Sequence, residues 1–189
     1  MKIRDITRLA NVMLGGKVDE NTFTKDVMDE ELTAMLADNK ILISLVECTN
    51  LVLCELAEEY LPLTAKETLS ISGIAPYAQF SKSPLQIISA RSNGNVKYIY
   101  RPDGVDFGIT GEVEVEYSYR PDKKGFLDEI EIGSTQLSER IFSYGVCAEY
   151  CLLTGEYEEA QVWDKRYKDN LLGALSKKSE MSVKIRQWS

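Results

Sequence analysis

Histidine is absent from this 189-residue sequence, and its absence removes several kinds of chemistry. Without it there is no Ser-His or Cys-His nucleophilic catalysis and no imidazole ligand for a metal ion. Long apolar runs are also missing, whereas a membrane-spanning helix needs about 18 such residues in succession. The N-terminal stretch MKIRDITRLANVML contains Asp5 and lacks the continuous apolar core of a signal peptide. We therefore expect no membrane span, and an amphipathic helix at this end.

Cysteine is scarce, with four in the chain. Cys48 and Cys54 lie on one predicted helix, and Cys147 and Cys151 lie on another. Four thiolates could bind zinc, but neither pair has the C-x-x-C spacing that is typical of such sites. Buried free thiols in a reducing cytoplasm explain the pattern better. We expect neither a metal nor a cofactor.

Positive charge is the minority sign, with 22 Lys and Arg against 30 Asp and Glu, and it is unevenly distributed. Residues 164–189 contain seven basic and three acidic side chains, a net charge of +4, which leaves −12 on the rest of the chain. The acidic body argues against nonspecific nucleic-acid binding, which needs a basic face. A short basic tail on an acidic body suits contact between protein subunits.

Apolar periodicity predicts helices at both ends of the chain. The first covers residues 3–14, and a longer helical pattern runs from about residue 29 to residue 60, where Pro62 ends it. Helix 136–154 has apolar residues on two faces, which indicates a helix enclosed by others. The next helix, 156–175, should lie outside, because it has one apolar stripe: Ala160, Trp163, Tyr167, Leu171 and Ala174.

Between Pro62 and Gly133 the period changes to two. In GEVEVEYSYRP, the apolar positions Val113, Val115, Tyr117 and Tyr119 should face inward, and Glu112, Glu114 and Glu116 outward. Residues 85–101 are predicted to form a hairpin that turns at Asn93-Gly94. Further strands are predicted at 68–72 and 129–132. Four to six antiparallel strands of this kind make a small sandwich or barrel.

These patterns predict an α+β fold. N-terminal helices (residues 1–62) and a C-terminal helical hairpin (134–178) should form a bundle. A small antiparallel β-sandwich or barrel (63–133) is inserted between them, and an extended C-terminal arm (179–189) follows.

Two features suggest surfaces for other proteins. In the helical stretch 40–61, Ile43, Leu51 and Cys54 lie among acidic residues, so they are either simply exposed or in contact with a neighbouring subunit. The ending VKIRQW alternates apolar and basic residues in a strand-like manner. It is either a strand that folds back onto its own domain or an arm that docks on a partner, by strand addition or by insertion of Trp188.

Acidic pairs that could indicate a hydrolase have structural explanations. Glu112 and Glu114 alternate on the outer face of a predicted strand. Glu158 and Glu159 occupy the first turn of a helix, where carboxylates interact favourably with the macrodipole. The segment RPDGVDFG lacks the spacing of a calcium loop and is predicted to be a turn between strands. We therefore predict no enzymatic activity.

Residues 141–188 resemble the head–tail connector, or portal adaptor, proteins of tailed bacteriophages. The resemblance is carried by Tyr144-Gly145, by Ala148-Glu149-Tyr150, by GEYEEA at 155–160, by WDKRY at 163–167 and by the basic aromatic ending. More loosely, the plan of helices enclosing a β module is similar to the adaptor of short-tailed phages.

This resemblance implies a non-catalytic structural virion protein, made in the host cytoplasm. Copies would form a ring, a dodecamer, at the head–tail junction and would join the capsid portal to tail or neck proteins. Sequence-specific nucleic-acid binding is not expected, although DNA could pass through the ring.

The resemblance also implies positions for the contacts. Ile43, Leu51 and Cys54 would lie at the subunit interface. The β module would project toward the tail, where loop 101–108 would meet tail components through Arg101, Asp103, Val105 and Phe107. The portal-docking arm would comprise Lys184, Ile185, Arg186 and Trp188.

Two other functions stay open. The chain could be a monomeric binding module whose β-sandwich recognises a carbohydrate or peptide, if Tyr98, Tyr100, Tyr117 and Tyr119 face outward. Less favoured is a tail-associated hydrolase that uses Glu112 or Glu158.

Overall fold

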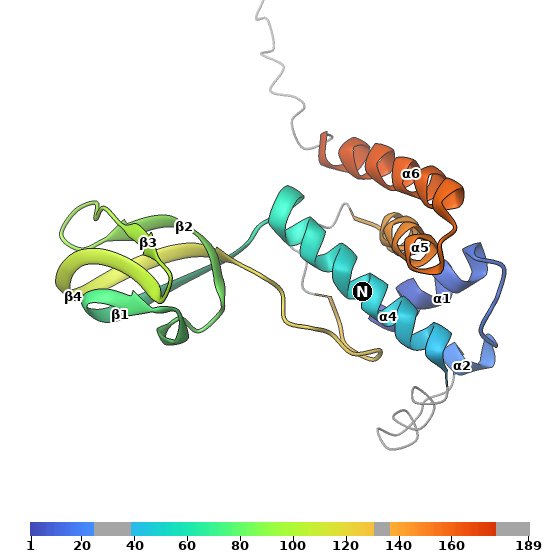
Figure 1. Cartoon of the computed structure of the whole chain (residues 1–189), viewed down its shortest axis with the longest axis horizontal. Helices are drawn as coiled ribbons and strands as arrows, with labels where there is room; N and C mark the ends of the chain where they lie inside the picture. Colours follow the sequence, from blue (N-terminus) through green and yellow to red (C-terminus); the bar gives the residue numbers. More distant parts are fainter. Residues whose placement is uncertain (25–38, 131–136, 177–189) are drawn as a thin grey trace, which may run out of the picture. The chain divides into compact units, whose positions relative to one another are not determined.

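The computed structural model describes residues 1–24, 39–130 and 137–176 (Figure 1). The chain divides into two compact units, one of helices, Met1–Val52 with Lys124–Ser189, and one built on a sheet, Leu53–Lys123. The predicted boundaries, at residues 62/63 and 133/134, lie about ten residues further along than these. The C-terminal arm and the predicted strand residues 131–132 lie outside the described residues, as does the predicted helix before residue 39.

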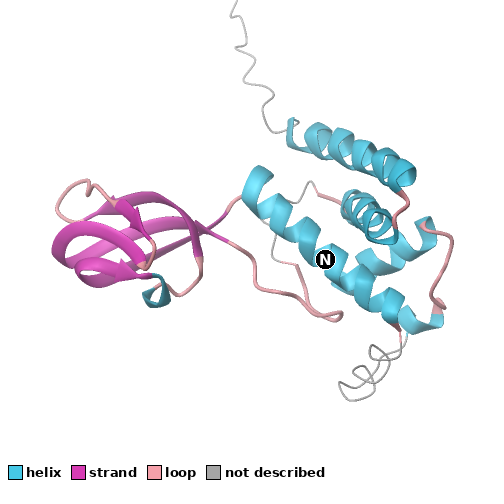
Figure 2. Ribbon diagram, in the orientation of Figure 1, coloured by secondary structure: helices cyan, strands magenta, loops and turns pink. Residues whose placement is uncertain are grey.

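The helical unit contains α1 (Ile3–Met13), the short α2 (Asn21–Thr24), α4 (Lys40–Glu55, whose last three residues belong to the other unit), α5 (Glu139–Thr154) and α6 (Tyr157–Ser176) (Figure 2). α5 packs against both α1 and α6. Ten of its residues are buried, in an unbroken run from Ile141 to Ala148 and again at Tyr150 and Cys151. The prediction of an enclosed helix is thus confirmed, although Leu153, placed on an apolar face from the sequence, is exposed.

α1 is anchored to α5 by its buried face. Ile3, Ile6 and Ala10 are fully buried. The Ser143 hydroxyl of α5 donates a hydrogen bond to the carbonyl oxygen of Ile6 at 3.0 Å. This bond joins residues that are 137 positions apart in the chain, so the N-terminal and C-terminal segments together form one hydrophobic core.

The sheet unit has four antiparallel strands: β1 (Leu63–Pro76), β2 (Pro84–Arg91), β3 (Ile99–Arg101) and β4 (Gly104–Tyr119). β4 pairs with every other strand, in the order β1-β4-β2 with β3 also on β4. Within residues 53–123, all of which the structure describes, β1, β2 and β3 do not pair with one another. The predicted sandwich or barrel is therefore corrected to one open sheet in an α+β fold.

The alternation predicted for β4 is confirmed at its centre. Val113, Val115 and Tyr117 are fully buried, whereas Glu112 and Glu114 are exposed. These three residues pack in one core with Leu69 and Ile71 of β1, Ile87 of β2 and Phe107 of β4 itself. The hydroxyl of Tyr117 donates to Glu67 at 2.6 Å, so the one polar group in this part of the core has a partner.

The predicted hairpin is half correct. Asn93 and Gly94 form the turn, with the Ser92 N–H bonded to the Gly94 carbonyl oxygen at 2.9 Å. The chain after the turn does not pair with β2 as a strand. Instead the Tyr98 hydroxyl donates to the Ile87 carbonyl oxygen at 2.9 Å, and the Tyr100 hydroxyl accepts from the Ile87 N–H at 2.7 Å. Two tyrosine hydroxyls thus bond to the backbone of Ile87, where a paired strand would otherwise supply its own backbone groups.

α4 ends in a π-helix, Leu56–Tyr60, whose last hydrogen bond joins the Leu61 N–H to the Leu56 carbonyl oxygen at 2.7 Å. The predicted end of this helix before Pro62 is confirmed. None of the described helices is both long and apolar enough to cross a membrane.

Candidate functional site: the α1–α6 groove

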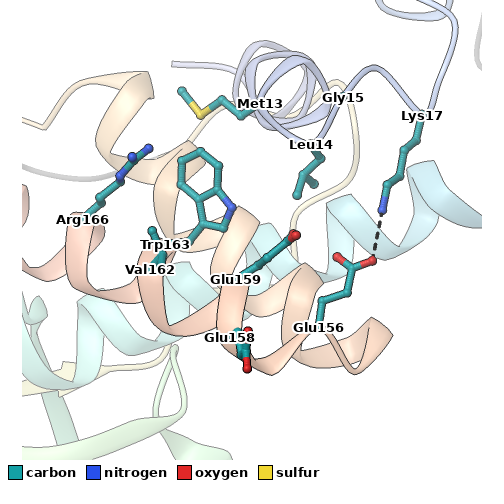
Figure 3. A pocket seen from close by; sticks show the side chains of 10 residues that line it. All are labelled: Met13, Leu14, Gly15, Lys17, Glu156, Glu158, Glu159, Val162, Trp163 and Arg166. Atoms are coloured by element: carbon teal, nitrogen blue, oxygen red, sulfur yellow. Dashed lines mark ion pairs between the residues drawn. The ribbon is translucent and has the colours of Figure 1, made fainter.

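A groove of about 730 Å³ lies between the end of α1 and the first half of α6 (Figure 3). We call it the α1–α6 groove. Its walls include apolar side chains as well as charged ones, and all belong to the helical unit. The lining residues are Met13, Leu14, Gly15, Lys17, Glu156, Glu158, Glu159, Val162, Trp163 and Arg166.

The first wall is held in shape by Asn11. Its side chain is buried, its amide donates to the Val18 carbonyl oxygen at 2.8 Å, and its oxygen accepts from the Val18 N–H at 2.9 Å. These two bonds close the loop after α1, where Gly16 has a φ of +71°. A buried amide with both partners satisfied is costly to disturb, so Leu14 and Lys17 are presented in a fixed position.

The second wall begins at a tight turn. Gly155 has a φ of +81°, a conformation that glycine adopts without steric cost. The Glu156 N–H bonds back to the Cys151 carbonyl oxygen at 2.8 Å, which ends α5 and lets α6 begin at once. The turn therefore brings Glu156, Glu158 and Glu159 to the start of α6, where the helix macrodipole favours negative charge.

Trp163 forms the aromatic part of the groove. Its ring stacks on Tyr144 of α5, with centroids 5.8 Å apart and an interplanar angle of 27°. The guanidinium of Arg166 lies 5.0 Å from the Trp163 ring centroid, within cation–π range. Figure 3 shows Trp163 and Glu159 pointing toward the wall that carries Met13 and Leu14. Trp163 is half-buried, so part of its ring stays open to the groove.

The groove has more acidic than basic groups. Lys17 pairs with Glu156 at 3.8 Å and lies over the Tyr150 ring. Within the part of the chain that the structure describes, Glu158 and Glu159 have no ion-pair partner. Burial, and secondarily the negative charge of Glu156, raise the pKa of the adjacent Cys151 thiol to about 11. The local potential is therefore negative.

Cys151, Glu156 and Glu159 bring three potential metal-ligand atoms within 4.8 Å of one another. A metal would have to displace the proton from a thiol that stays protonated at neutral pH. Acidic side chains at a helix start already have the macrodipole as their explanation. We therefore assign no metal to this cluster.

The remaining cysteines are free thiols and lie in both units. Cys48 and Cys147 are buried, and burial raises the pKa of each to about 12. Cys54 belongs to the sheet unit and is half-buried, and burial raises its pKa as well. The one possible ligand group found among the described residues contains Cys151 and none of the other three cysteines.

The predicted interface residues of α4 are presented to solvent to different degrees. Leu51 is 56% exposed and Ile43 is 39% exposed. Cys54 is less accessible than either. The structure thus leaves Leu51 and Ile43 available to a partner, and their role as an interface stays a prediction.

The predicted tail-side loop 101–108 is mostly strand. Arg101 ends β3, Asp103 lies in the turn, and β4 begins at Gly104. Val105 and Phe107 belong to the buried core of the sheet, so their side chains cannot meet a partner there. Arg101 and Asp103 keep exposed side chains, and Arg101 also pairs with Asp106 at 3.1 Å.

The portal-docking arm, Lys184, Ile185, Arg186 and Trp188, lies outside the described residues. The α1–α6 groove itself was missed from the sequence. Periodicity predicts a buried stripe that includes Trp163, which is half-buried in the structure, and a helix start that holds Glu158 and Glu159, which the structure confirms. The juxtaposition with residues 13–17 depends on the packing of chain segments about 140 positions apart, and periodicity alone carries no such information.

No protein-family model matches this chain, and no curated protein matches it. The resemblance of residues 141–188 to portal adaptors therefore rests on the sequence pattern.

Proposed function

We propose that this protein is a non-catalytic structural virion protein that assembles into a ring and joins the capsid portal to the phage tail. Apart from the basic aromatic ending, which lies outside the described residues, the motifs that resemble portal adaptors lie on α5, the Gly155 turn and α6. These elements form a tightly connected helical hairpin, which is what a rigid ring subunit requires.

One observation carries the proposal: among the large apolar side chains that the helical unit exposes, two groups lie on different elements. The first is α4, with Ile43 and Leu51. The second is the corner between α5 and α6, where Leu153 is 64% and Tyr157 66% exposed. A closed ring needs two different surfaces on each subunit, because the surface of one copy binds the other surface of the next. Two apolar patches on one small unit meet this need.

The sheet unit is proposed to face the tail. Ile88, Ile99 and Tyr100 are exposed on β2 and β3, with Ile99 60% accessible, next to Arg101 and Asp103. The same residues would suit a monomeric module that binds a peptide. The aromatic face proposed for carbohydrate binding is weaker, because Tyr117 is fully buried.

The ring is tested by Leu51→Glu against Leu172→Glu. Both leucines are 56% exposed on helices, so each change should be tolerated by the fold. We expect Leu51→Glu to abolish assembly and Leu172→Glu to leave it intact. Circular dichroism melts report folding, and sedimentation with negative-stain micrographs, alone and with purified portal rings, reports assembly.

If both variants assemble equally well, α4 is not part of the ring interface. A wild-type chain that stays monomeric and does not bind portal rings would refute the proposed function and favour the binding module. The arm is tested separately by deleting residues 180–189. Unchanged affinity for portal rings would show that the arm does not dock there.

A further inference from the structure

The α1–α6 groove presents an apolar surface and acidic side chains together. Its apolar surface comes from Met13, Leu14 and Val162 together with Trp163, and Val162 is 53% exposed. At the same end lie Glu158 and Glu159, which have no ion-pair partner within the described residues. A ligand that fits would be apolar and basic at once, with cations placed near an aromatic or aliphatic group.

The C-terminal arm has this complementary chemistry. Residues 177–189 contain four Lys and Arg against one acidic residue. In an extended segment alternate side chains share a face, so Lys184, Arg186 and Trp188 would point the same way. Two cations would then face the glutamates, and an indole would face the apolar wall of the groove.

The arm is also long enough to reach the groove of its own chain. α6, from Tyr157 to Ser176, is about 30 Å long, at about 1.5 Å per residue. Trp188 is twelve residues beyond Ser176, and an extended chain of that length spans about 40 Å. A tether of this kind gives an effective concentration of roughly millimolar, so contacts that are weak singly suffice to hold the arm.

We propose that, in the free protein, the α1–α6 groove binds the chain's own C-terminal arm, with Lys184 and Arg186 at Glu158 and Glu159 and with Trp188 beside Trp163. The arm then stays bound in the groove until a partner that binds it more tightly displaces it. This inference needs neither a portal nor a ring, so its failure would leave the proposed function standing.

The chain provides its own reporter, because Trp163 and Trp188 are its only tryptophans. In the full-length variant Trp163→Phe, fluorescence comes from Trp188 alone. We expect Trp188 to be shielded from acrylamide, a neutral quencher that is insensitive to charge changes. Adding Glu158→Lys and Glu159→Lys should raise the quenching constant to that of the same chain unfolded in urea.

The matched control is Asp169→Lys with Glu112→Lys. Both residues are exposed and lie outside the groove, and the change in net charge is the same. This control should leave Trp188 shielded. Because Trp163→Phe alters the groove itself, the measurement is repeated as the difference between the wild-type chain and Trp188→Phe.

Three results would overturn the proposal. Trp188 could be fully accessible in both measurements. It could be equally shielded with and without the glutamate changes, which would place the arm elsewhere. Shielding could also vanish on dilution while sedimentation shows a loss of mass, which would assign the arm to a second copy; a tethered arm is independent of protein concentration.

Discussion

Replacing Gly145 of α5 by alanine should destabilise the helical unit, although alanine is the better helix former. A Cβ at this position would lie 3.0 and 3.1 Å from the two methyl carbons of Val52 on α4. It would lie 3.3 Å from Cδ2 of Tyr167 on α6. At Gly145, α4 and α6 thus both approach α5 too closely to leave room for a side chain.

The magnitude follows from two opposing effects. Alanine in a helix interior is favoured over glycine by about 1 kcal/mol. Overpacking a filled core costs about 1–3 kcal/mol. Val52 and Tyr167 are both 1% exposed, and a valine in a helix has one strongly preferred rotamer, so neither neighbour yields easily. The difference is about 0–2 kcal/mol, and because both neighbours are held in place we expect a net loss near its upper end, about 2 kcal/mol, in the free energy of unfolding.

Gly173 of α6 is the matched control. It too lies inside a helix, but a Cβ there would meet nothing within 4 Å. Gly173→Ala should therefore stabilise the unit by about 0.5–1 kcal/mol. Urea unfolding is followed by tryptophan fluorescence in a Trp188→Phe background, so that Trp163 reports on the helical unit alone. If Gly145→Ala stabilises the protein as much as Gly173→Ala does, the close packing of α4 and α6 on α5 is wrong.

Three further predictions test other parts of the structure. Tyr98→Phe should lower the free energy of unfolding of the sheet by about 1 kcal/mol, measured by circular dichroism in urea. Tyr77→Phe, which removes an exposed hydroxyl, should lower it by less. Equal losses in the two variants would contradict the role of Tyr98 at the β2 edge. Asn11→Ala should cost about 2–3 kcal/mol because it leaves two buried backbone groups without partners, and a loss under half of this would mean that the loop after α1 is held otherwise. Burial, and secondarily the charge of Asp164, raise the pKa of Glu149, so the folded state holds this proton more tightly and the associated stability is lost as pH rises through the folded pKa. Glu149→Gln should thus raise the urea midpoint at neutral pH more than at about pH 4, and a pH-independent effect would show that protonation is not involved.

The parts of the fold that sequence reasoning predicted are those set by local periodicity. The alternation of β4 and the turn at Gly155 each follow from residues within one element. β1 is longer than predicted, since it runs from Leu63 to Pro76 and includes an inward-facing Glu67. A carboxylate at such a position breaks the apolar pattern, and only its bond to the Tyr117 hydroxyl, fifty residues away, explains it.

Contacts between distant segments account for what the sequence did not reveal. A sheet closes only if its edge strands pair with each other. Here the Ile87 N–H and carbonyl oxygen on β2 bond to the Tyr100 and Tyr98 hydroxyls and not to another strand. Likewise, the candidate groove needs α1 and α6 side by side. The segment RPDGVDFG predicts a turn that includes Val105 and Phe107, but β4 already begins at Gly104, so the turn is shorter than its Gly and Asp residues indicate.

The bond between Ser143 and Ile6 has a consequence for how the chain folds during synthesis. α1 leaves the ribosome before any of the sheet, yet its buried face has to wait for α5, 137 residues later. The sheet unit, by contrast, contains all its strands between Leu63 and Tyr119 and can close in the meantime. α1 is thus made before the sheet but completes its packing after it, and until then Ile3, Ile6 and Ala10 are open to chaperones, proteases and other nascent chains.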